Sequence, residues 1–315
     1  MTWRVLRHLS TALAVTALLL FAASCSDDDG DGPNEPTVSW SEMTSGTTVS
    51  LPAIWGSSGS NVFAVGDNGT ILHYDGTAWS AMTSGSTTFL QAVWGASGSD
   101  VFSVGYGVNG TILHYNGTAW SDMTPGTIAN VICVWGSSGS DVFAAGYSGT
   151  ILHYNGTAWS PMTSGFTGTL SGIWGSSASD VFVVGDGGAV LHYNGTNWSA
   201  MTSGSTSLLK CVWGTASNNV FAAGDNGTIL RYNGTAWSAM TSGTTASIPG
   251  LWGSSGNDVY AAGYGGTAGT VLHYDGTSWS SVKSSPGKWL YSVWGTSASN
   301  VFVSGGVGAI LHYST

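Results

Sequence analysis

Charged side chains are scarce in this sequence. Only 7% of its 315 residues are Asp, Glu, Lys or Arg, and six Lys and Arg residues stand against 16 Asp and Glu residues. A protein that binds nucleic acid needs clustered basic side chains to neutralise phosphates, so we expect no nucleic-acid partner. Glu, Lys and Gln, which favour helices, are nearly absent from most of the chain. Val, Ile, Thr and aromatic residues, which favour strands, are plentiful.

The acidic residues are also too sparse for a glycosidase-like site. Such enzymes place two carboxylates on either side of one bond. After residue 36, Glu42 is the single Glu, and most Asp residues recur at equivalent turn positions. We therefore predict a non-catalytic protein that needs no cofactor and no metal.

Cysteine is rare as well, with Cys25, Cys133 and Cys211 as its only three positions. Cys133 and Cys211 each stand two residues before a Trp-Gly pair, in repeats that are not neighbours. Their Cα atoms are expected to lie farther apart than the limit of about 7 Å for a disulfide. The sequence therefore predicts two buried free thiols.

A Trp-Gly pair recurs seven times, at steps of 39, 41, 39, 39, 39 and 42 residues, and a second Trp recurs with the same steps. Self-similarity at a fixed period of this size is typical of stacked supersecondary units. The first series is Trp55, Trp94, Trp135, Trp174, Trp213, Trp252 and Trp294, and the second is Trp40, Trp79, Trp120, Trp159, Trp198, Trp237 and Trp279.

One repeat, residues 51–82, divides into four short runs separated by turns that contain Gly, Asn or Asp. The runs cover residues 51–56, 61–66, 70–74 and 77–82. This pattern predicts four antiparallel strands. We expect Asp75-Gly76 and its equivalents to form two-residue type I′ turns. The second run is apolar on both faces, so the sheet must be covered on both sides.

The two ends of the repeat region complement each other. The last repeat stops at Tyr313 without a fourth strand, while one extra copy of that strand, around Trp40, precedes the first repeat. We expect these segments to pair and close a ring, because an open stack would leave two uncapped faces. Residues 37–315 are thus predicted to form an all-β, seven-bladed β-propeller with four antiparallel strands per blade. Each Trp of a Trp-Gly pair is expected to wedge between blades.

The repeated motif Val-Gly-x-x-Gly-Thr-Ile-Leu-x-Tyr-Asp-Gly-Thr-x-Trp, followed by Thr-Ser-Gly, resembles secreted bacterial BNR-type propellers. It is similar in particular to the photosystem II assembly-factor-like group. A weaker resemblance is to kelch repeats, whose double Gly is mostly missing here. The resemblance implies the fold but no photosynthetic role, because propellers host many unrelated functions. BNR proteins include sialidases, whose arginine triad cannot be built from the single Arg231 of this domain.

The first 24 residues resemble an export signal. Arg4 and Arg7 precede an apolar run at residues 12–23 that is too short to span a membrane comfortably. Residues 22–25, Ala-Ala-Ser-Cys, resemble a bacterial lipobox. The resemblance implies cleavage before Cys25 and lipidation of its thiol.

Residues 25–36 contain the lipidated Cys and an acidic segment rich in Gly and Pro, which we predict to be a disordered tether. The protein is expected to be extracytoplasmic and attached to the membrane through its lipid alone. The outer membrane is the expected site, with the propeller on the periplasmic side or at the cell surface.

Six histidines occupy one place in the third strand, where the fifth repeat has Arg231. They lie one per blade, too far apart to share a metal at the nitrogen distance of about 2.0–2.1 Å. We expect each to bond a Ser, Thr or backbone group of its own blade. The Asp or Asn before each second strand is expected to cap the loop backbone. The histidines are His73, His114, His153, His192, His273 and His312.

Three places vary most among the repeats. They lie five and three residues before each Trp-Gly pair and in the turn after the second strand. In a four-stranded blade all three are expected at one rim, around the mouth of the central channel. The candidate ligand-binding residues there are Phe89, Gln91, Tyr106, Tyr147, Asp186, Lys210, Asp225, Tyr264, Trp289 and Tyr291.

Aromatic side chains mixed with a few charges suit a protein or glycan surface. We predict a monomeric, lipid-anchored recognition or scaffold module that binds an envelope or extracellular protein through this face. The alternative is lectin-like binding, with carbohydrate stacked on the same aromatic residues.

Overall fold

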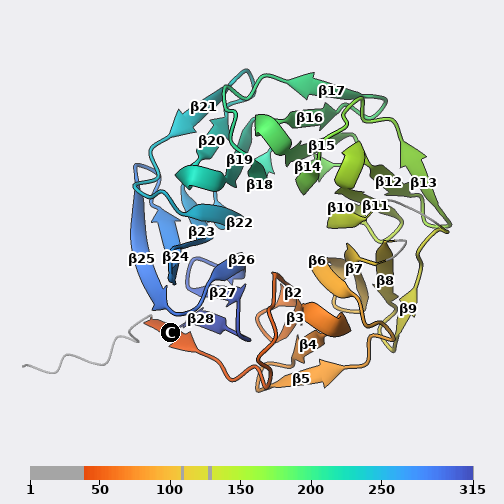
Figure 1. Cartoon of the computed structure of the whole chain (residues 1–315), viewed down its shortest axis with the longest axis vertical. Coiled ribbons are helices and arrows are strands. Elements are labelled where there is room, and N and C mark those ends of the chain that lie inside the picture. The colour runs from red at the N-terminus through yellow and green to blue at the C-terminus, as the bar shows by residue number, and fades with distance from the viewer. Residues whose placement is uncertain (1–38, 108–109, 127–129, 315) are drawn as a thin grey trace, which may run out of the picture. The chain divides into compact units, whose positions relative to one another are not determined.

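The computed structural model describes residues 39–107, 110–126 and 130–314. Over these residues the chain forms seven four-stranded antiparallel sheets in a ring, which is a seven-bladed β-propeller (Figure 1). The predicted fold class is therefore confirmed. The predicted signal peptide, Cys25 and the acidic tether lie outside the described residues. Within the described ranges, no helix is long and apolar enough to cross a membrane.

The first strand of each blade lies nearest the centre of the ring, and the second strand lies one step outward (Figure 1). The first strands are β2 (Ala53–Ser58), β6 (Phe89–Ser97), β10 (Val131–Ser138), β14 (Leu170–Ser177), β18 (Leu209–Ala216), β22 (Ser247–Ser255) and β26 (Leu290–Ser297). The second strands are β3 (Asn61–Val65), β7 (Asp100–Tyr106), β11 (Asp141–Gly146), β15 (Asp180–Gly185), β19 (Asn219–Gly224), β23 (Asp258–Gly265) and β27 (Asn300–Gly305).

The third and fourth strands complete each blade toward the periphery (Figure 1). The third strands are β4 (Ile71–Tyr74), β8 (Thr111–Tyr115), β12 (Ile151–Tyr154), β16 (Val190–Tyr193), β20 (Ile229–Tyr232), β24 (Ala268–Tyr274) and β28 (Ile310–Ser314). The fourth strands are β5 (Trp79–Met82), β9 (Trp120–Asp122), β13 (Trp159–Met162), β17 (Trp198–Met201), β21 (Trp237–Met240), β25 (Trp279–Pro286) and β1 (Ser39–Glu42). Short 3-10 turns between second and third strands are η1 (Asp67–Gly69), η2 (Tyr147–Gly149), η3 (Asp186–Gly188) and η4 (Asp225–Gly227).

Each Trp-Gly pair connects its blade to the next one around the ring. A Cβ atom added to Gly95 would lie 2.5 Å from Cη2 of Trp55 in the preceding blade, closer than real side chains approach. The same contact recurs at all seven of these glycines, and Trp294 of the last blade meets Gly56 of the first. We call this contact the Trp–Gly interlock. It confirms the expected wedge between blades. Together with a nearby backbone carbonyl, Asp100 O at 2.9 Å in the case of Gly95, it explains why a residue without a side chain follows each Trp.

The core is spread between neighbouring blades. Phe102 in β7 is fully buried. Its ring centroid lies 4.5 Å from that of His114 in its own blade and 6.3 Å from that of Trp159 in the next blade, edge to face at 82°. Such aromatic pairs contribute roughly 0.5–1.5 kcal/mol beyond the area they bury. Since each blade is covered by two neighbours, the second strands are apolar on both faces, as the sequence predicts.

The ring is closed by pairing of the chain's two ends. β1 runs antiparallel to β28, with Trp40 opposite Tyr313. The ring of Trp40 also packs edge-on against Tyr260 of the sixth blade, with centroids 6.3 Å apart at 72°. The seventh sheet therefore has the order β1-β28-β27-β26, and the predicted closure is confirmed.

The turns between third and fourth strands differ from the prediction. β4 and β5 pair with four residues between them rather than two. Gly76 has φ of 95°, while Asp75 is not among the residues with positive φ. Asp75 Oδ1 instead accepts the backbone N–H groups of Thr77 and Ala78 at 2.8 and 2.9 Å. The type I′ prediction is wrong because the Asp side chain forms an Asx turn with its own loop.

Removing the closing strand tests whether closure stabilises the whole ring. We expect a chain that begins at Thr44 to unfold with a free energy about 3 kcal/mol or more below that of a chain beginning at Val38. Losing the packing of one large aromatic residue alone costs about that much. Chemical denaturation monitored by tryptophan fluorescence measures the difference. Equal denaturation midpoints for the two chains would contradict the role given to this strand.

Candidate functional site

The three variable places of each blade lie together at one rim of the propeller. The backbone N–H of Asp186 donates to the carbonyl of Thr169 at 3.0 Å, and equivalent bonds recur in other blades. In the second blade the corresponding residues, Phe89 and Tyr106, pair along β6 and β7. The turn after each second strand is thus attached directly to the residues that lead into the first strand.

A cavity of about 820 Å³ lies at the centre of the ring and is lined by residues of all seven blades. Eight of the ten predicted site residues line it, namely Phe89, Gln91, Tyr106, Tyr147, Asp186, Lys210, Tyr264 and Tyr291. The other two contact this lining, because Asp225 pairs with Lys210 and Trp289 stacks on Tyr264. We call these ten residues the channel mouth. The structure brings all ten together, while their role in binding stays a prediction.

Aromatic residues of the second and third blades form one cluster at the mouth. The ring of Tyr106 lies between those of Phe89 and Tyr147, with centroid distances of 5.2 and 5.8 Å. The Tyr147 hydroxyl donates to the Tyr106 hydroxyl at 3.3 Å. Burial and this hydrogen bond raise the pKa of Tyr106, so it stays neutral at any physiological pH. Tyr147 is 37% exposed, so part of its side chain is accessible to solvent.

A second aromatic cluster joins the sixth and seventh blades. Tyr264 stacks on Trp289 with centroids 5.0 Å apart at 20°, and meets Tyr291 edge-on at 5.5 Å. The Trp289 indole Nε1–H donates to the carbonyl of Gly266 at 3.1 Å, which fixes the ring although it is 45% exposed. An ordered, exposed aromatic ring of this kind is a common anchor in protein interfaces.

The positive charge of Lys210 is balanced by Asp225 within the channel mouth. Its ammonium lies 2.7 Å from Asp225 Oδ1, donates to the Ser247 hydroxyl at 2.8 Å and lies 5.5 Å from the centre of the Tyr264 ring. Burial disfavours the charged form of Lys210, but hydrogen bonds to Asp225 and Tyr264 outweigh it and raise its pKa. Burial acts on Asp225 in the opposite sense to its bonds with Lys210 and Ser247, which prevail and lower its pKa. Both groups therefore stay charged at neutral pH.

The cavity wall away from the mouth is apolar. It is made of first-strand residues, with all seven Trp-Gly tryptophans among them. Cys133 and Cys211 belong to this wall and are free thiols, as predicted, but only Cys133 is buried and Cys211 is partly exposed. The Cys133 thiol donates to the carbonyl of Ala145 at 3.5 Å, and burial raises its pKa to about 12. Burial raises the pKa of Cys211 as well, so neither thiol supplies a nucleophilic thiolate.

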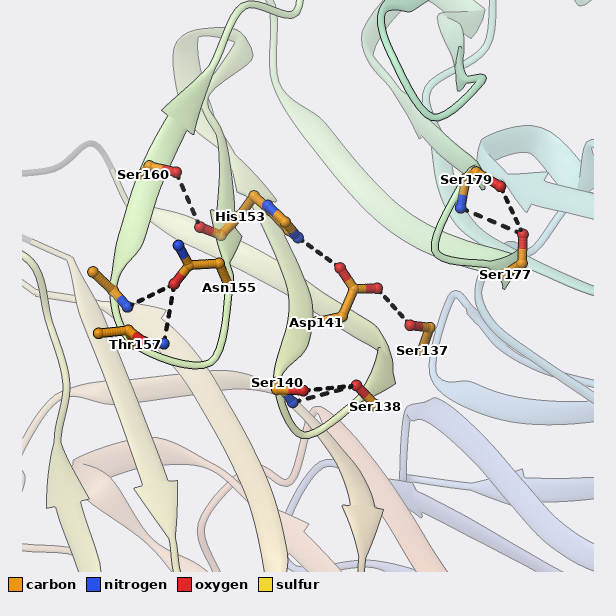
Figure 2. A network of polar contacts seen from close by, with 11 residues as sticks. Ser137, Ser138, Ser140, Asp141, His153, Asn155, Thr157, Ser160, Ser177 and Ser179 are labelled. Atoms are coloured by element: carbon orange, nitrogen blue, oxygen red, sulfur yellow. Dashed lines mark hydrogen bonds and ion pairs between the residues drawn. The ribbon is translucent and has the colours of Figure 1, made fainter.

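The blade histidines bond acidic or amide side chains, which corrects two sequence predictions. Figure 2 shows His153 Nε2, which lies 2.6 Å from Asp141 Oδ1. The partner is the residue before the second strand, expected to cap loop backbone, and not a Ser, Thr or backbone group. The register explains the pairing: His153 lies opposite Phe143, and Asp141 is the diagonal neighbour of His153 on the same face. The same contact joins His73 to Asn61, His114 to Asp100, His192 to Asp180, His273 to Asp258 and His312 to Asn300.

This network contains Ser, His and Asp but in an order unsuited to nucleophilic catalysis. The Ser137 hydroxyl donates to Asp141 Oδ2, while His153 binds the other oxygen of the same carboxylate (Figure 2). In a serine hydrolase the imidazole stands between the hydroxyl and the acid and removes the hydroxyl proton. Here the carboxylate takes the middle position, so the network fastens the strands together and places no imidazole beside the serine.

Val307 is an exposed residue of this rim that sequence reasoning missed. It follows Gly306 in the turn after β27, has φ of 56° and is 60% exposed. The equivalent residues are Asn68, Ser148, Gly187 and Asn226, also with positive φ. A β-branched residue is strained in this region, whereas Asn and Gly tolerate it. The signal was therefore present in the sequence as a valine where the other repeats have small or polar residues.

Comparisons with known proteins identify the fold and not a family. The sequence matches no protein-family model and no curated protein. Among solved structures, YCF48 bound to D1 peptide is similar with 19% identity and a TM-score of 0.70, over 88% of this chain and 97% of that one. YCF48 from Cyanidioschyzon merolae is similar with 16% identity and a TM-score of 0.70, over 87% and 98% of the two chains.

WD40 propellers share the architecture too. The WD40 β-propeller domain of Doa1 is 12% identical with a TM-score of 0.75, over 89% of this chain and 98% of that chain. At these identities the likeness supports a β-propeller of the type seen in YCF48 and WD40 proteins and shows the fold alone.

Some blade histidines have an Asp partner and others have an Asn partner. This difference makes the effect of the partner on the histidine pKa testable. Burial lowers the pKa of His312, whose partner is the neutral Asn300. We expect Asn300→Asp to raise the His312 pKa by about 1 unit or more, because a carboxylate at hydrogen-bond distance favours the imidazolium. NMR titration of the histidine ring protons measures this, with His73 beside the unchanged Asn61 as the internal control.

The same substitution has a consequence for stability. A folded-state pKa below the unfolded value means that the native protein loses stability as pH falls below about 6.5. Asn300→Asp should reduce that loss. An unchanged His312 pKa would contradict the assigned contact.

Proposed function

We propose that this chain is a non-catalytic recognition propeller that binds a protein partner across the channel mouth. One observation carries the proposal: the places that differ most between repeats gather around one cavity, and they include aromatic and charged side chains such as Phe89, Tyr147 and Lys210. Positions that the fold needs, such as the Trp–Gly interlock and the blade histidines, repeat with little change. The similar propeller YCF48 is known with a bound D1 peptide, which supports a peptide or protein as ligand.

Exposed apolar side chains favour the same face. Among the described residues the large exposed hydrophobics are Tyr147, Val282, Trp289 and Val307, and three of these four lie at or beside the mouth. Exposed aromatic anchors surrounded by polar groups are typical of interface hot spots. Val282, on the peripheral strand β25, provides a control position away from the mouth.

We propose that the partner is an envelope or extracellular protein, because the N-terminal segment resembles a lipoprotein export signal. Residues 22–25 support cleavage before Cys25 and attachment of a lipid to its thiol, so we propose a lipid-anchored, extracytoplasmic protein. Mass spectrometry of protein extracted from membranes tests this. An unmodified N-terminus or a retained leader would count against it.

A lectin-like function is the second candidate. The ring of Trp289 is fixed by its bond to Gly266 and by stacking on Tyr264, and it is 45% exposed. A sugar ring can stack on such a surface. Binding on a glycan array that disappears in Trp289→Ala would favour this candidate over the protein partner.

Replacing Tyr147 and Trp289 together by Ala tests the proposed face. We expect the doubly substituted protein to stay folded, because both rings are partly exposed. It should recover its cross-linked envelope partner at least about tenfold less well, since hot-spot aromatics contribute about 2 kcal/mol or more each. Quantitative mass spectrometry after cross-linking measures recovery, and Val282→Ala should recover the partner like the wild type. The same recovery from all three proteins would place the interface elsewhere.

A further inference from the structure

A network of polar contacts joins the fifth and sixth blades at the channel mouth. The ammonium of Lys210, in β18 of the fifth blade, lies 2.7 Å from Asp225 Oδ1. It also donates to the hydroxyls of Ser247 and Tyr264 at 2.8 and 3.2 Å. Ser247 lies opposite Tyr264 in the pairing of β22 and β23, and its hydroxyl donates to Asp225 Oδ1 at 2.6 Å. Lys210 therefore fastens its own blade to the first two strands of the next one.

These contacts use all the hydrogen-bonding capacity of Lys210. An ammonium group carries three N–H donors, and one acceptor stands against each of them, on Asp225, Ser247 and Tyr264. The Lys210 side chain is also only 22% exposed. The sequence places Lys210 among the candidate ligand-binding residues, but this geometry favours a task within the protein over direct contact with a partner.

The supports of Trp289 come from the segment that Lys210 holds. The Trp289 ring stacks on Tyr264 with centroids 5.0 Å apart, and its indole N–H donates to the carbonyl of Gly266, two residues further along. Lys210 contacts Tyr264 twice, at the hydroxyl and over the ring, 5.5 Å from its centre. A displacement of Tyr264 would therefore disturb both supports of Trp289, one of the exposed aromatic rings of the mouth.

The other aromatic cluster of the mouth is held in a different way. Tyr106 and Tyr147 occupy the turn equivalent to that of Tyr264, in the second and third blades, and their hydroxyls bond each other at 3.3 Å. Phe89 packs on Tyr106 with centroids 5.2 Å apart. This cluster is fixed by its own aromatic side chains, whereas Tyr264 is held by a charged side chain of the preceding blade.

We propose that Lys210 is a positioning residue that holds Tyr264, and through it the Trp289 ring, in the orientation that a protein partner contacts. Asp225 is the counterion that keeps the ammonium in place. This inference rests on the proposed function and identifies how one of its aromatic anchors is prepared before binding. An anchor that is already ordered loses less conformational entropy when the partner binds.

The free protein tests the positioning directly. Lys210→Met removes the charge and the three donors but keeps an unbranched side chain of similar length. We expect it to shift the NMR resonance of the Trp289 indole N–H and to speed the exchange of this proton with solvent. Trp289→Phe assigns the resonance by its disappearance. As the matched control, Lys283→Met removes the same charge from the peripheral strand β25 and should leave the resonance unchanged.

A smaller change isolates the contact between Lys210 and Tyr264. Tyr264→Phe removes only the hydroxyl that Lys210 binds and keeps the ring that stacks on Trp289, so it also guards against a folding defect in Lys210→Met. It should shift the Trp289 resonance in the same direction by a smaller amount. An unchanged Trp289 resonance in either folded variant would overturn the inference.

Partner recovery separates positioning from direct contact. With a photoactivated cross-linker that does not react through lysine, Lys210→Met should reduce recovery of the partner roughly two- to tenfold, the cost of ordering one anchor side chain. In a Trp289→Ala background the same substitution should cause no further loss. A full further loss there would mean that Lys210 contacts the partner itself, which would overturn the inference and leave the mouth as the binding face. If Tyr147→Ala with Trp289→Ala leaves recovery unchanged, the proposed function fails and this inference fails with it.

Discussion

The Trp–Gly interlock is the contact on which the rest of the propeller depends. Each Trp fills the space above the glycine of the next blade, and seven such contacts run around the ring until Trp294 meets Gly56. Because Trp and Gly are adjacent in each pair, every blade contributes a Trp that packs on the next blade and a Gly that receives the Trp of the preceding blade. Only a closed ring lets every one of these Trp residues meet a Gly of the next blade, which agrees with the pairing of β1 and β28.

The positions that maintain the fold are distinct from the positions that differ between blades. The interlock, a buried Phe in the second strand (Tyr260 in blade six) and the bond from a third-strand histidine to Asp or Asn (from Arg231 in blade five) repeat from blade to blade. They hold the first strands in fixed positions around the cavity. The loops at one rim are then free to differ, and their differences are what distinguish one side of the mouth from another. Aromatic clusters lie over blades two and three and over blades six and seven, while Lys210 and Asp225 form an ion pair within blade five, from which Lys210 also reaches Ser247 of blade six.

The sequence was sufficient for the architecture because the period, the turn residues and the spare strand around Trp40 are all local signals. It was also sufficient to place ten divergent residues at one rim. It failed where the outcome depended on cross-strand geometry. The partner of His153 is Asp141 because β11 and β12 pair in a particular register, and no spacing rule specifies that register. The Asp75 side chain accepts hydrogen bonds from its own loop, and these bonds favour an Asx turn over the type I′ turn.

The interlock is tested most directly by a double-mutant cycle on Trp55 and Gly95. Gly95→Ala places a Cβ atom 2.5 Å from the Trp55 ring and should cost about 1–3 kcal/mol of unfolding free energy, as overpacking does. In a Trp55→Leu background the clash with the ring is relieved and only the close approach to the Asp100 carbonyl at 2.9 Å remains, so the cost should fall by about 1 kcal/mol or more, the coupling expected for residues in direct contact. Equal costs of Gly95→Ala in the two backgrounds would contradict the account, because the glycine would then be needed for a reason other than the neighbouring tryptophan.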